Sequence, residues 1–291
     1  MAKSVLEIKK LTKYYGQIKG VENLTLTLNE GEIFGFIGPN GAGKSTTIRA
    51  IMNLINKTSG EVLINNKEFK KNDIELKKII GYLPSEISLY DNFTVKEMLD
   101  YHESFYSPDT HVKRKELVNL LELDEKKYVE DLSLGNLKKL GIVLALMHSP
   151  KIIILDEPTS GLDPIMQNKF FDLLKEEKNN GATIFYSTHI LSEISKICDR
   201  VGIIKDGNLI KIENVENLIN NNLLFVTIKS KDIDKIKNEL HIKVEIKDEN
   251  VIKFANNINI NELLKVISKY QIDNLIIEEA TLEDMFLHYY K

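Results

Sequence analysis

The sequence predicts an α/β fold built around a phosphate-binding loop, followed by a small α+β module. The first prediction rests on two features: residues 38–46 fit the pattern G-x-x-x-x-G-K-[ST], and an apolar run at 152–155 ends in two acidic residues. The second rests on a change of composition near residues 220–222, after which short β and α patterns alternate. We therefore divide the 291 residues into a larger domain, 1–219, and an accessory module, 220–291.

The phosphate loop follows a strand-like apolar run, 33–37, and precedes a helical segment expected at 47–54. Its glycines let the backbone wrap around a phosphate with N–H groups pointing inward, and the helix presents its positive end. Lys44 is expected to reach the β- and γ-phosphates, and the Ser45 hydroxyl to complete Mg²⁺ coordination. The residues predicted to hold a nucleoside triphosphate in this loop are Gly38, Pro39, Asn40, Gly41, Ala42, Gly43, Lys44, Ser45 and Thr46.

The segments around this loop are predicted to be mainly β. Residues 6–11 and 24–28 alternate apolar and polar side chains, as half-buried antiparallel strands do. A strand at 61–64 is followed by the hairpin turn Asn65-Asn66, and another strand is expected at 79–83.

From Thr94 to about Leu123 the pattern becomes helical. Thr94 and Glu97 form a T-x-x-E capping box at its start. The residues expected to share one apolar face of this helix are Met98, Leu99, His102 and Phe105. On such a face, we interpret His102 as a structural residue.

The apolar run 152–155 is typical of a strand buried on both faces of a parallel sheet, and it ends in Asp156 and Glu157. A carboxylate there is costly unless it serves a metal ion or a hydrogen-bond network. Asp156 is therefore assigned to Mg²⁺, in the Walker B role, and Glu157 to polarising the water that attacks the γ-phosphate. An ordinary acidic turn before Pro158 is the alternative.

A strand at 183–187 runs into Thr188 and His189, and a further strand at 200–205 ends at the hairpin turn Asp206-Gly207. A histidine just beyond the carboxyl end of a buried strand lies on the ligand-binding edge of an open α/β sheet. His189 is therefore a candidate to hydrogen-bond the γ-phosphate, although an isolated histidine is usually only structural.

A second anion site is predicted where Ser133 and Gly135 precede the helical run 138–147. Because the chain already has a complete phosphate loop, a second site implies a second molecule, whose nucleotide this helix end would cap. A purely structural N-cap role for Ser133 is an equal alternative.

These motifs, in this order and at this spacing, resemble the nucleotide-binding subunit of ABC transporters. The resemblance covers about residues 3–215 and implies an ABC-type nucleotide-binding domain, 1–219. That domain would have a RecA-like P-loop NTPase core, an antiparallel β subdomain and a helical subdomain at about 86–140. It also implies that two such domains sandwich two ATP molecules. Each ATP would be held by one subunit's phosphate loop and by the other's signature residues Ser133, Gly135 and Asn136.

The same likeness assigns two further features. Asp163 ends the D-loop, and Tyr15 stacks on adenine, a contact that can contribute about 1–3 kcal/mol. Tyr14 is the alternative stacking residue, or both tyrosines simply pack at a strand end.

The chain departs from the family pattern in two places. The signature, usually L-S-G-G-Q, reads L-S-L-G-N here, and the bulky Leu134 is expected to point away from the phosphate. The Q-loop glutamine is replaced by Ser85, which can contact Mg²⁺ or water with a shorter reach, and Glu86 is a candidate to share the task. Both departures, together with the sequence 280–290, resemble the branch of bacitracin-type resistance and ABC-2 exporters.

The C-terminal module reads β-α-β-β-α-β, which indicates a split-βαβ, ferredoxin-like unit, followed by a last helix from Thr281. Thr281 and Asp284 repeat the capping-box pattern. Three aromatic residues at helical spacing are interpreted as core packing, with a dimer or permease contact as the alternative: Phe286, Tyr289 and Tyr290.

Composition excludes several classes of protein. A net charge of −4 gives no basic field that would point to nucleic acid. No apolar run approaches the ~20 residues of a membrane-spanning helix, and the N-terminus lacks the apolar segment of a signal peptide. The single cysteine, Cys198, fits a packed thiol in a reducing cytosol. The protein is therefore expected in the cytoplasm, held at the inner face of the membrane through its permease.

The leading hypothesis is an ATP-hydrolysing subunit of an exporter that works as a homo- or heterodimer beneath a separate transmembrane permease. One alternative is a soluble ABC ATPase acting on ribosomes or DNA, but the chain has one phosphate loop, no heptad run and no basic patch. A non-hydrolysing, nucleotide-gated regulatory subunit is the other. Ser85 and Leu134 suggest it, while the presence of Glu157 and His189 argues against it.

Overall fold

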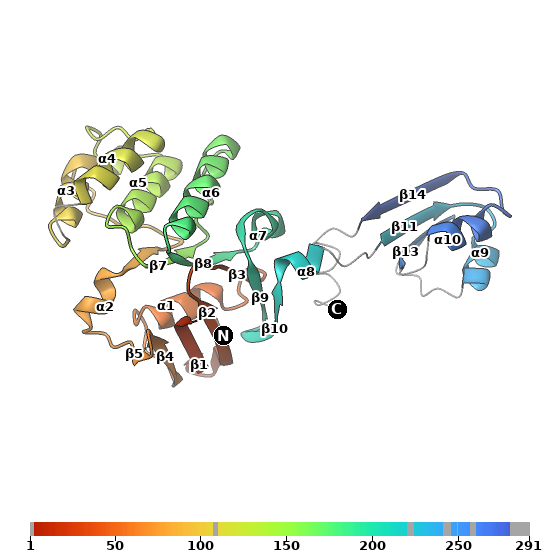
Figure 1. Cartoon of the computed structure of the whole chain (residues 1–291), viewed down its shortest axis with the longest axis horizontal. Helices are drawn as coiled ribbons and strands as arrows, with labels where there is room; N and C mark the ends of the chain where they lie inside the picture. The colour runs from red at the N-terminus through yellow and green to blue at the C-terminus, as the bar shows by residue number, and fades with distance from the viewer. Residues whose placement is uncertain are drawn as a thin grey trace. The chain divides into compact units, whose positions relative to one another are not determined.

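The computed structural model describes residues 3–106, 110–219, 224–240, 246–248, 250–256 and 260–279. The chain divides into two compact units, Met1–Val215 and Glu216–Lys291 (Figure 1). The division falls at the start of helix α8 (Val215–Ile219), whereas the sequence placed the boundary at the end of that helix.

The first sheet of the larger unit is antiparallel, with the strand order β2-β1-β4-β5. Its strands are β1 (Ser4–Tyr15), β2 (Ile18–Asn29), β4 (Ser59–Ile64) and β5 (Lys67–Glu68). The expected hairpin turn is confirmed, because Asn65 and Asn66 both have positive φ, 49° and 63°, and connect the paired strands β4 and β5.

The second sheet has the order β10-β9-β3-β8-β7-β6 and is parallel except for β10, which pairs antiparallel with β9. Its strands are β3 (Ile33–Ile37), β6 (Ile80–Leu83), β7 (Ile152–Asp156), β8 (Thr183–Thr188), β9 (Arg200–Lys205) and β10 (Asn208–Asn214). Every residue of β3, β7 and β8 is buried, which explains why these strands read as continuous apolar runs.

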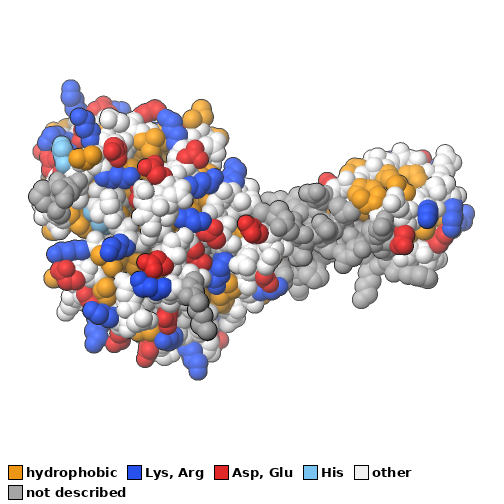
Figure 2. Space-filling model, viewed as in Figure 1, with side chains coloured by type: hydrophobic (Ala, Val, Ile, Leu, Met, Phe, Trp, Pro, Cys, Tyr) orange, Lys and Arg blue, Asp and Glu red, His pale blue; other side chains and the backbone are white. Residues whose placement is uncertain are grey.

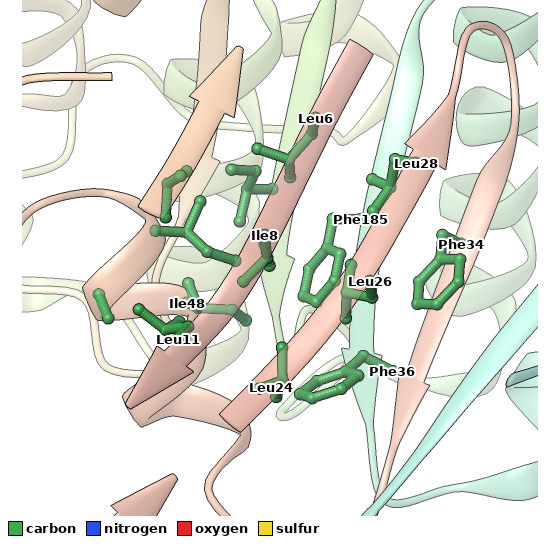
Figure 3. Packing of buried hydrophobic residues seen from close by; sticks show 14 of the residues in the cluster. Leu6, Ile8, Leu11, Leu24, Leu26, Leu28, Phe34, Phe36, Ile48 and Phe185 are labelled. Carbon is green, nitrogen blue, oxygen red and sulfur yellow. The ribbon is translucent and has the colours of Figure 1, made fainter. Parts of the chain in front are cut away.

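The core of this unit lies between the two sheets (Figure 3). Leucine and isoleucine side chains of β1 and β2 pack against aromatic rings from the parallel sheet. Phe185 is the centre of the aromatic group, with ring centroids 6.0 Å from Phe34 and 5.2 Å from Phe36. Helix α1 (Lys44–Ile51) contacts β1, β2 and β7, so it too lies between the sheets. The phosphate loop is thereby joined directly to this buried core.

Helix α1 begins three residues earlier than the sequence indicated. The loop itself forms the first turn: Gly43 is the N-cap, with φ +106°, and the Thr47 N–H donates to the Gly43 carbonyl oxygen. A Cβ at position 43 would lie 2.7 Å from the Gly20 carbonyl oxygen, so this position requires glycine both for its conformation and for space. Lys44 and Ser45 therefore belong to the first turn of the helix.

A group of helices follows β6 and forms a separate part of the larger unit (Figure 1). Its helices are α3 (Val95–Glu103), α4 (Thr110–Leu120), the 3₁₀ turn η1 (Val129–Asp131) and α5 (Leu134–Leu146), and a short helix α2 (Ile74–Lys78) precedes β6. The capping box of Thr94 and Glu97 is confirmed. Phe105 is an exception to the predicted apolar face, because it follows the end of α3 and is 55% exposed.

Segments 91–96 and 125–130 form a short stem at the base of α3 and α4. Thr94 and Tyr128 form an antiparallel bridge. Backbone hydrogen bonds on either side of it run from the Val95 N–H to the Lys127 carbonyl and from the Val129 N–H to the Phe93 carbonyl, each at 2.9 Å. The stretch carrying α3 and α4 therefore leaves and rejoins the rest of the unit at one place.

The other face of the parallel sheet is covered by α6 (Pro164–Asn179) and α7 (Leu191–Ile197). Cys198, at the end of α7, is buried and free, as predicted. On the face shown in Figure 2, positive and negative side chains are interspersed over this unit. Within the ranges given above, no helix combines the length and apolar character that crossing a membrane requires.

The C-terminal unit contains an antiparallel sheet of order β12-β13-β11-β14 with two helices. Its elements are β11 (Leu224–Lys229), α9 (Ile233–Leu240), β12 (Ile246–Asp248), β13 (Val251–Asn256), α10 (Ile260–Ile267) and β14 (Asn274–Glu279). An apolar cluster that includes Val226, Ile236, Phe254 and Leu263 forms its core. The small α+β module is therefore confirmed, whereas the last helix and its aromatic residues (Phe286, Tyr289 and Tyr290) lie outside the described residues.

Candidate functional site

A cleft with a volume of about 520 Å³ lies over the phosphate loop. Its walls bring together predicted site residues from five separate segments of the chain. The residues that line it are Tyr15, Ile18, Lys19, Gly20, Asn40, Gly41, Gly43, Lys44, Ser45, Thr46, Ser85, Glu86, Glu157, Ser160 and His189. The segments meet because β3, β6, β7 and β8 are parallel neighbours or near neighbours, so the loops after them emerge at one edge of the sheet.

The phosphate-loop lysine is buried and held in place. The Lys44 ammonium donates to the carbonyl oxygens of Gly38, at 2.7 Å, and Pro39, at 3.2 Å. It also lies 3.2 Å from Glu157 Oε1. A positive charge at the start of α1 is thus fixed at the floor of the cleft and balanced by a carboxylate from the end of β7.

Glu157 contacts a second predicted residue. The His189 Nδ1–H donates to Glu157 Oε2 at 2.8 Å, so the two carboxylate oxygens separately contact Lys44 and His189. Glu157 has a φ of +49°, a left-handed conformation that is uncommon for a residue with a long side chain. Such backbone strain gathers at functional sites, where the surrounding structure enforces it.

Asp156 is 1% exposed and ends β7 directly beneath Glu157. Ser187, on the adjacent strand β8, donates to Asp156 Oδ1 at 2.6 Å. Asp156 Oδ2 is buried and has no hydrogen-bond partner among the described residues. A buried, half-satisfied carboxylate of this kind fits a hydrated cation.

The donor set is also chemically suited to Mg²⁺. The described residues contain no cluster of three or more His, Cys, Asp and Glu side chains that could enclose an ion. Mg²⁺ commonly binds through one or two protein oxygens together with substrate phosphates and water, so a single carboxylate flanked by hydroxyl groups is sufficient. Ser45 and Ser85 line the cleft and carry hydroxyl groups of that kind.

The lysine Lys138, on α5, was not singled out from the sequence. It is 2% exposed, and its ammonium donates to the backbone carbonyls of Ser85, at 3.0 Å, and Glu157, at 3.3 Å. Burial lowers the pKa of Lys138, while the charges of Asp156 and Glu157 act in the opposite direction. In the sequence it stands next to a second lysine, Lys139, at the start of a largely apolar helical run, and nothing there separates the two.

A second residue missed from the sequence is Glu193, on α7, which is 3% exposed. Its carboxylate accepts hydrogen bonds from the hydroxyls of Thr159, at 2.6 Å, Tyr186, at 2.9 Å, and Thr188, at 2.6 Å. Thr159 follows the Glu157 turn and Thr188 precedes His189. Glu193 therefore connects the two segments that carry these residues.

The two tyrosines considered for adenine have different surroundings. Tyr15 is 45% exposed and lines the cleft, with the Lys13 ammonium 4.7 Å from its ring centroid. Tyr14 donates its hydroxyl to Glu22 at 2.8 Å and does not line the cleft. The geometry therefore favours Tyr15 as the ring available to a base.

The signature residues do not line this cleft. Ser133 is the N-cap of α5, and its hydroxyl accepts from the Asn136 N–H at 3.3 Å. Gly135 lies so close to the D-loop that an added Cβ would be 2.8 Å from the Gly161 carbonyl oxygen. Leu134 is 66% exposed, and its side chain lies against Gly161.

Asp163 ends the D-loop as the N-cap of α6. Its carboxylate accepts from the N–H groups of Ile165 and Met166, each at 3.0 Å. These backbone hydrogen bonds, Met166 first, lower the pKa of Asp163. Among the described residues, the signature end of α5 therefore lies outside the lining of the chain's own phosphate-loop cleft.

Comparison with known proteins gives one consistent result. The ABC transporter family profile matches residues 21–160. The bacitracin transport ATP-binding protein BcrA of Bacillus licheniformis is 38% identical over 80% of this chain and 77% of its own length. The lantibiotic transport ATP-binding protein SrtF of Streptococcus pyogenes is 37% identical over 76% of this chain and 98% of its own. A dimeric bacterial ABC transporter cassette superposes with a TM-score of 0.66 at 29% identity, covering 72% of this chain and 98% of that structure.

Proposed function

This chain belongs to the family of ABC transporter ATP-binding subunits, and we propose that it hydrolyses ATP in a closed dimer to drive export through a separate permease. The observation that carries the proposal is the cleft in which the phosphate loop, Glu157 and His189 meet. The relatives named for bacitracin and lantibiotic transport support an antibiotic or peptide as the cargo. The permease would hold the chain at the inner face of the membrane.

Nucleotide binding begins with an exchange of partners at Lys44. Its ammonium leaves Glu157 Oε1 for the β- and γ-phosphate oxygens, while the N–H groups of the loop surround the phosphates. The exchange releases one oxygen of Glu157 at the edge of the cleft. That oxygen is then available to accept a proton from the attacking water, a contribution of about 10²–10⁴ in rate.

His189 orients the carboxylate during this step. Because its Nδ1–H is donated to Glu157 Oε2, the other ring nitrogen, Nε2, can donate to a phosphate oxygen only in the imidazolium form. A γ-phosphate placed at Nε2 would accept that hydrogen bond, so the contact of His189 with the nucleotide depends on whether the γ-phosphate is present. The second oxygen of Glu157 stays fixed while the first acts on water.

Mg²⁺ would be held by Ser45, Asp156 and Ser85, and when bound it supplies positive charge to the phosphate oxygens. The partner's signature end completes the site. Ser133 and Gly135 stand at the N-terminus of α5, where the helix dipole favours the negative charge of a γ-phosphate. Once ATP is hydrolysed and the cleaved phosphate leaves, that charge is gone from the site. The dimer therefore prefers the closed state only while ATP is intact, and this difference drives the permease.

The proposal is tested with Glu157→Gln in the full chain. We expect the variant to bind ATP and form a stable dimer by light scattering, while phosphate release falls at least about 100-fold. Glu176→Gln, an exposed glutamate on α6, is the matched control. A wild-type protein that releases no phosphate even with its permease in liposomes, or unchanged turnover in the Glu157 variant, would refute the assignment.

A further inference from the structure

Lys138 is an unusual residue for its position. It stands in the second turn of α5, and it is among the largest fully buried side chains of the described chain. Lysine is almost never fully buried unless its ammonium is paired, because the charge loses its hydration. The contacts that offset this cost therefore indicate what the side chain does.

Those contacts connect two of the chain segments that line the cleft. The ammonium donates to the carbonyls of Ser85 and Glu157, which follow β6 and β7. β6 and β7 are paired in the parallel sheet, with Leu83 opposite Leu155, so the two segments leave the sheet side by side. Lys138 thus bridges the two segments from α5, outside the sheet. One of its two acceptors is the carbonyl of Glu157, whose backbone is left-handed.

The same helix carries the signature end. Ser133 caps α5, and Lys138 lies five positions further along the helix. An α-helix is stiff over this length, so a displacement of its N-terminus also moves the Lys138 ammonium. The Ser133 end of α5 is the end that the proposed dimer places at the partner's nucleotide. Lys138, in the same helix, contacts the Ser85 and Glu157 segments of the chain's own cleft.

We propose that Lys138 is a positioning residue that couples the two composite ATP sites of the dimer, by connecting the Ser133 end of α5 to Ser85 and Glu157 of its own site. The inference rests on the closed dimer proposed above. When the partner's nucleotide draws in the helix end, the ammonium carries the carbonyls of Ser85 and Glu157 with it. Hydrolysis at one site then depends on occupancy of the other, a coupling that acts in both directions for binding.

The test compares Lys138→Met, which keeps the aliphatic stem and removes the donors, with Lys138→Arg, which keeps charge and donors. Lys115→Met, an exposed lysine on α4, is the control. Three quantities are measured below the melting temperature of every variant: the Kd of a non-hydrolysable ATP analogue for dilute monomer, the rate of phosphate release, and its Hill coefficient in ATP.

We expect Lys138→Met to lower kcat at least about tenfold and to bring the Hill coefficient to about 1. Its monomer Kd should change by less than about twofold, because the ammonium does not line the cleft. Lys138→Arg should recover part of the rate and of the cooperativity. If Lys138→Met does not fold, Lys138→Leu, which also lacks a donor, is held to the same criteria.

The inference is overturned if Lys138→Met retains the wild-type rate and cooperativity, or if its only change is a lower melting temperature. It is also overturned if monomer affinity falls in parallel with the rate, because Lys138 would then act on binding within one site. A wild-type chain that forms no ATP-dependent dimer would instead refute the proposed function itself.

Discussion

The contact between Lys44 and Glu157 predicts that Glu157→Gln binds nucleotide more tightly than the wild-type chain, even as an isolated monomer. In the structure, the carboxylate lies 3.2 Å from the ammonium that ATP must engage. Glu157 thus competes with phosphate for Lys44. Glutamine keeps the shape and an oxygen that accepts from His189, but it removes the negative charge.

The size of the effect follows from the surroundings of the pair. The Lys44 side chain is 6% exposed and that of Glu157 is 17% exposed, so solvent screens the contact only in part. Hydrogen bonds to charged groups contribute about 1.5–3 kcal/mol net. Because Lys44 keeps its bonds to the Gly38 and Pro39 carbonyls, we take the lower end of that range. The expected gain is about tenfold in Kd.

The assay is equilibrium binding of a non-hydrolysable ATP analogue at a protein concentration where light scattering shows monomers only. This condition separates the effect from dimer trapping. His189→Ala is the control, because it removes the other partner of Glu157 and leaves Lys44 paired, so its affinity should not rise. An unchanged or weaker Kd for Glu157→Gln in the monomer would refute the competition argument.

Three further predictions concern residues around the site and in the helical part. Tyr15→Ala should weaken ATP binding by about 1–3 kcal/mol and leave inorganic tripolyphosphate binding unchanged, whereas Tyr14→Phe should alter neither; equal loss for both ligands would contradict stacking on adenine. Glu193→Gln should lower the free energy of unfolding by about 1–3 kcal/mol and slow phosphate release, because a carboxamide cannot accept all three hydroxyl hydrogen bonds. Glu176→Gln, at an exposed glutamate, is the control. Wild-type stability in the Glu193 variant would argue against a positioning role for Glu193. His148 donates from Nε2 to the Ile80 carbonyl while its Nδ1 is buried without a partner among the described residues, and burial lowers the pKa of His148 to about 4. The unfolded chain protonates this histidine at a higher pH than the folded chain does, so the free energy of unfolding should fall as the pH drops from about 6.5 to 4. Chemical denaturation at each pH measures this slope. His148→Phe should lose the slope, whereas control substitutions of surface Lys or Asp residues should keep it.

The sequence predicted the elements that depend on local patterns. The capping box of Thr94 and Glu97 and the Asn65-Asn66 turn are confirmed because each is fixed by residues a few positions apart. The start of α1 was misplaced because glycines and a lysine are read as loop residues, although the loop wraps directly into the first helical turn. Phe105 was misassigned because a helical period does not show where the helix ends.

The site divides in the same way. The phosphate loop, Glu157 and His189 were recognised from motifs and do meet in one cleft. Lys138 and Glu193 were missed, because each acts on groups distant in the chain: Ser85 is 53 positions from Lys138, and Thr159 is 34 from Glu193. Only the folded sheet brings these segments together, and the periodicity around a buried charged residue does not reveal its partners.

The stem that joins residues 91–96 to 125–130 has a consequence for local unfolding. Helices α3 and α4 can unfold locally without separating any strand of the parallel sheet, because the stem holds together the two ends of the segment that carries them. Amide exchange in these two helices should therefore be faster than in β3, β7 and β8, with the stem as the border between the two rates. A permease that contacts α3 and α4 would act on a segment that can unfold and refold locally while the ATP cleft stays folded.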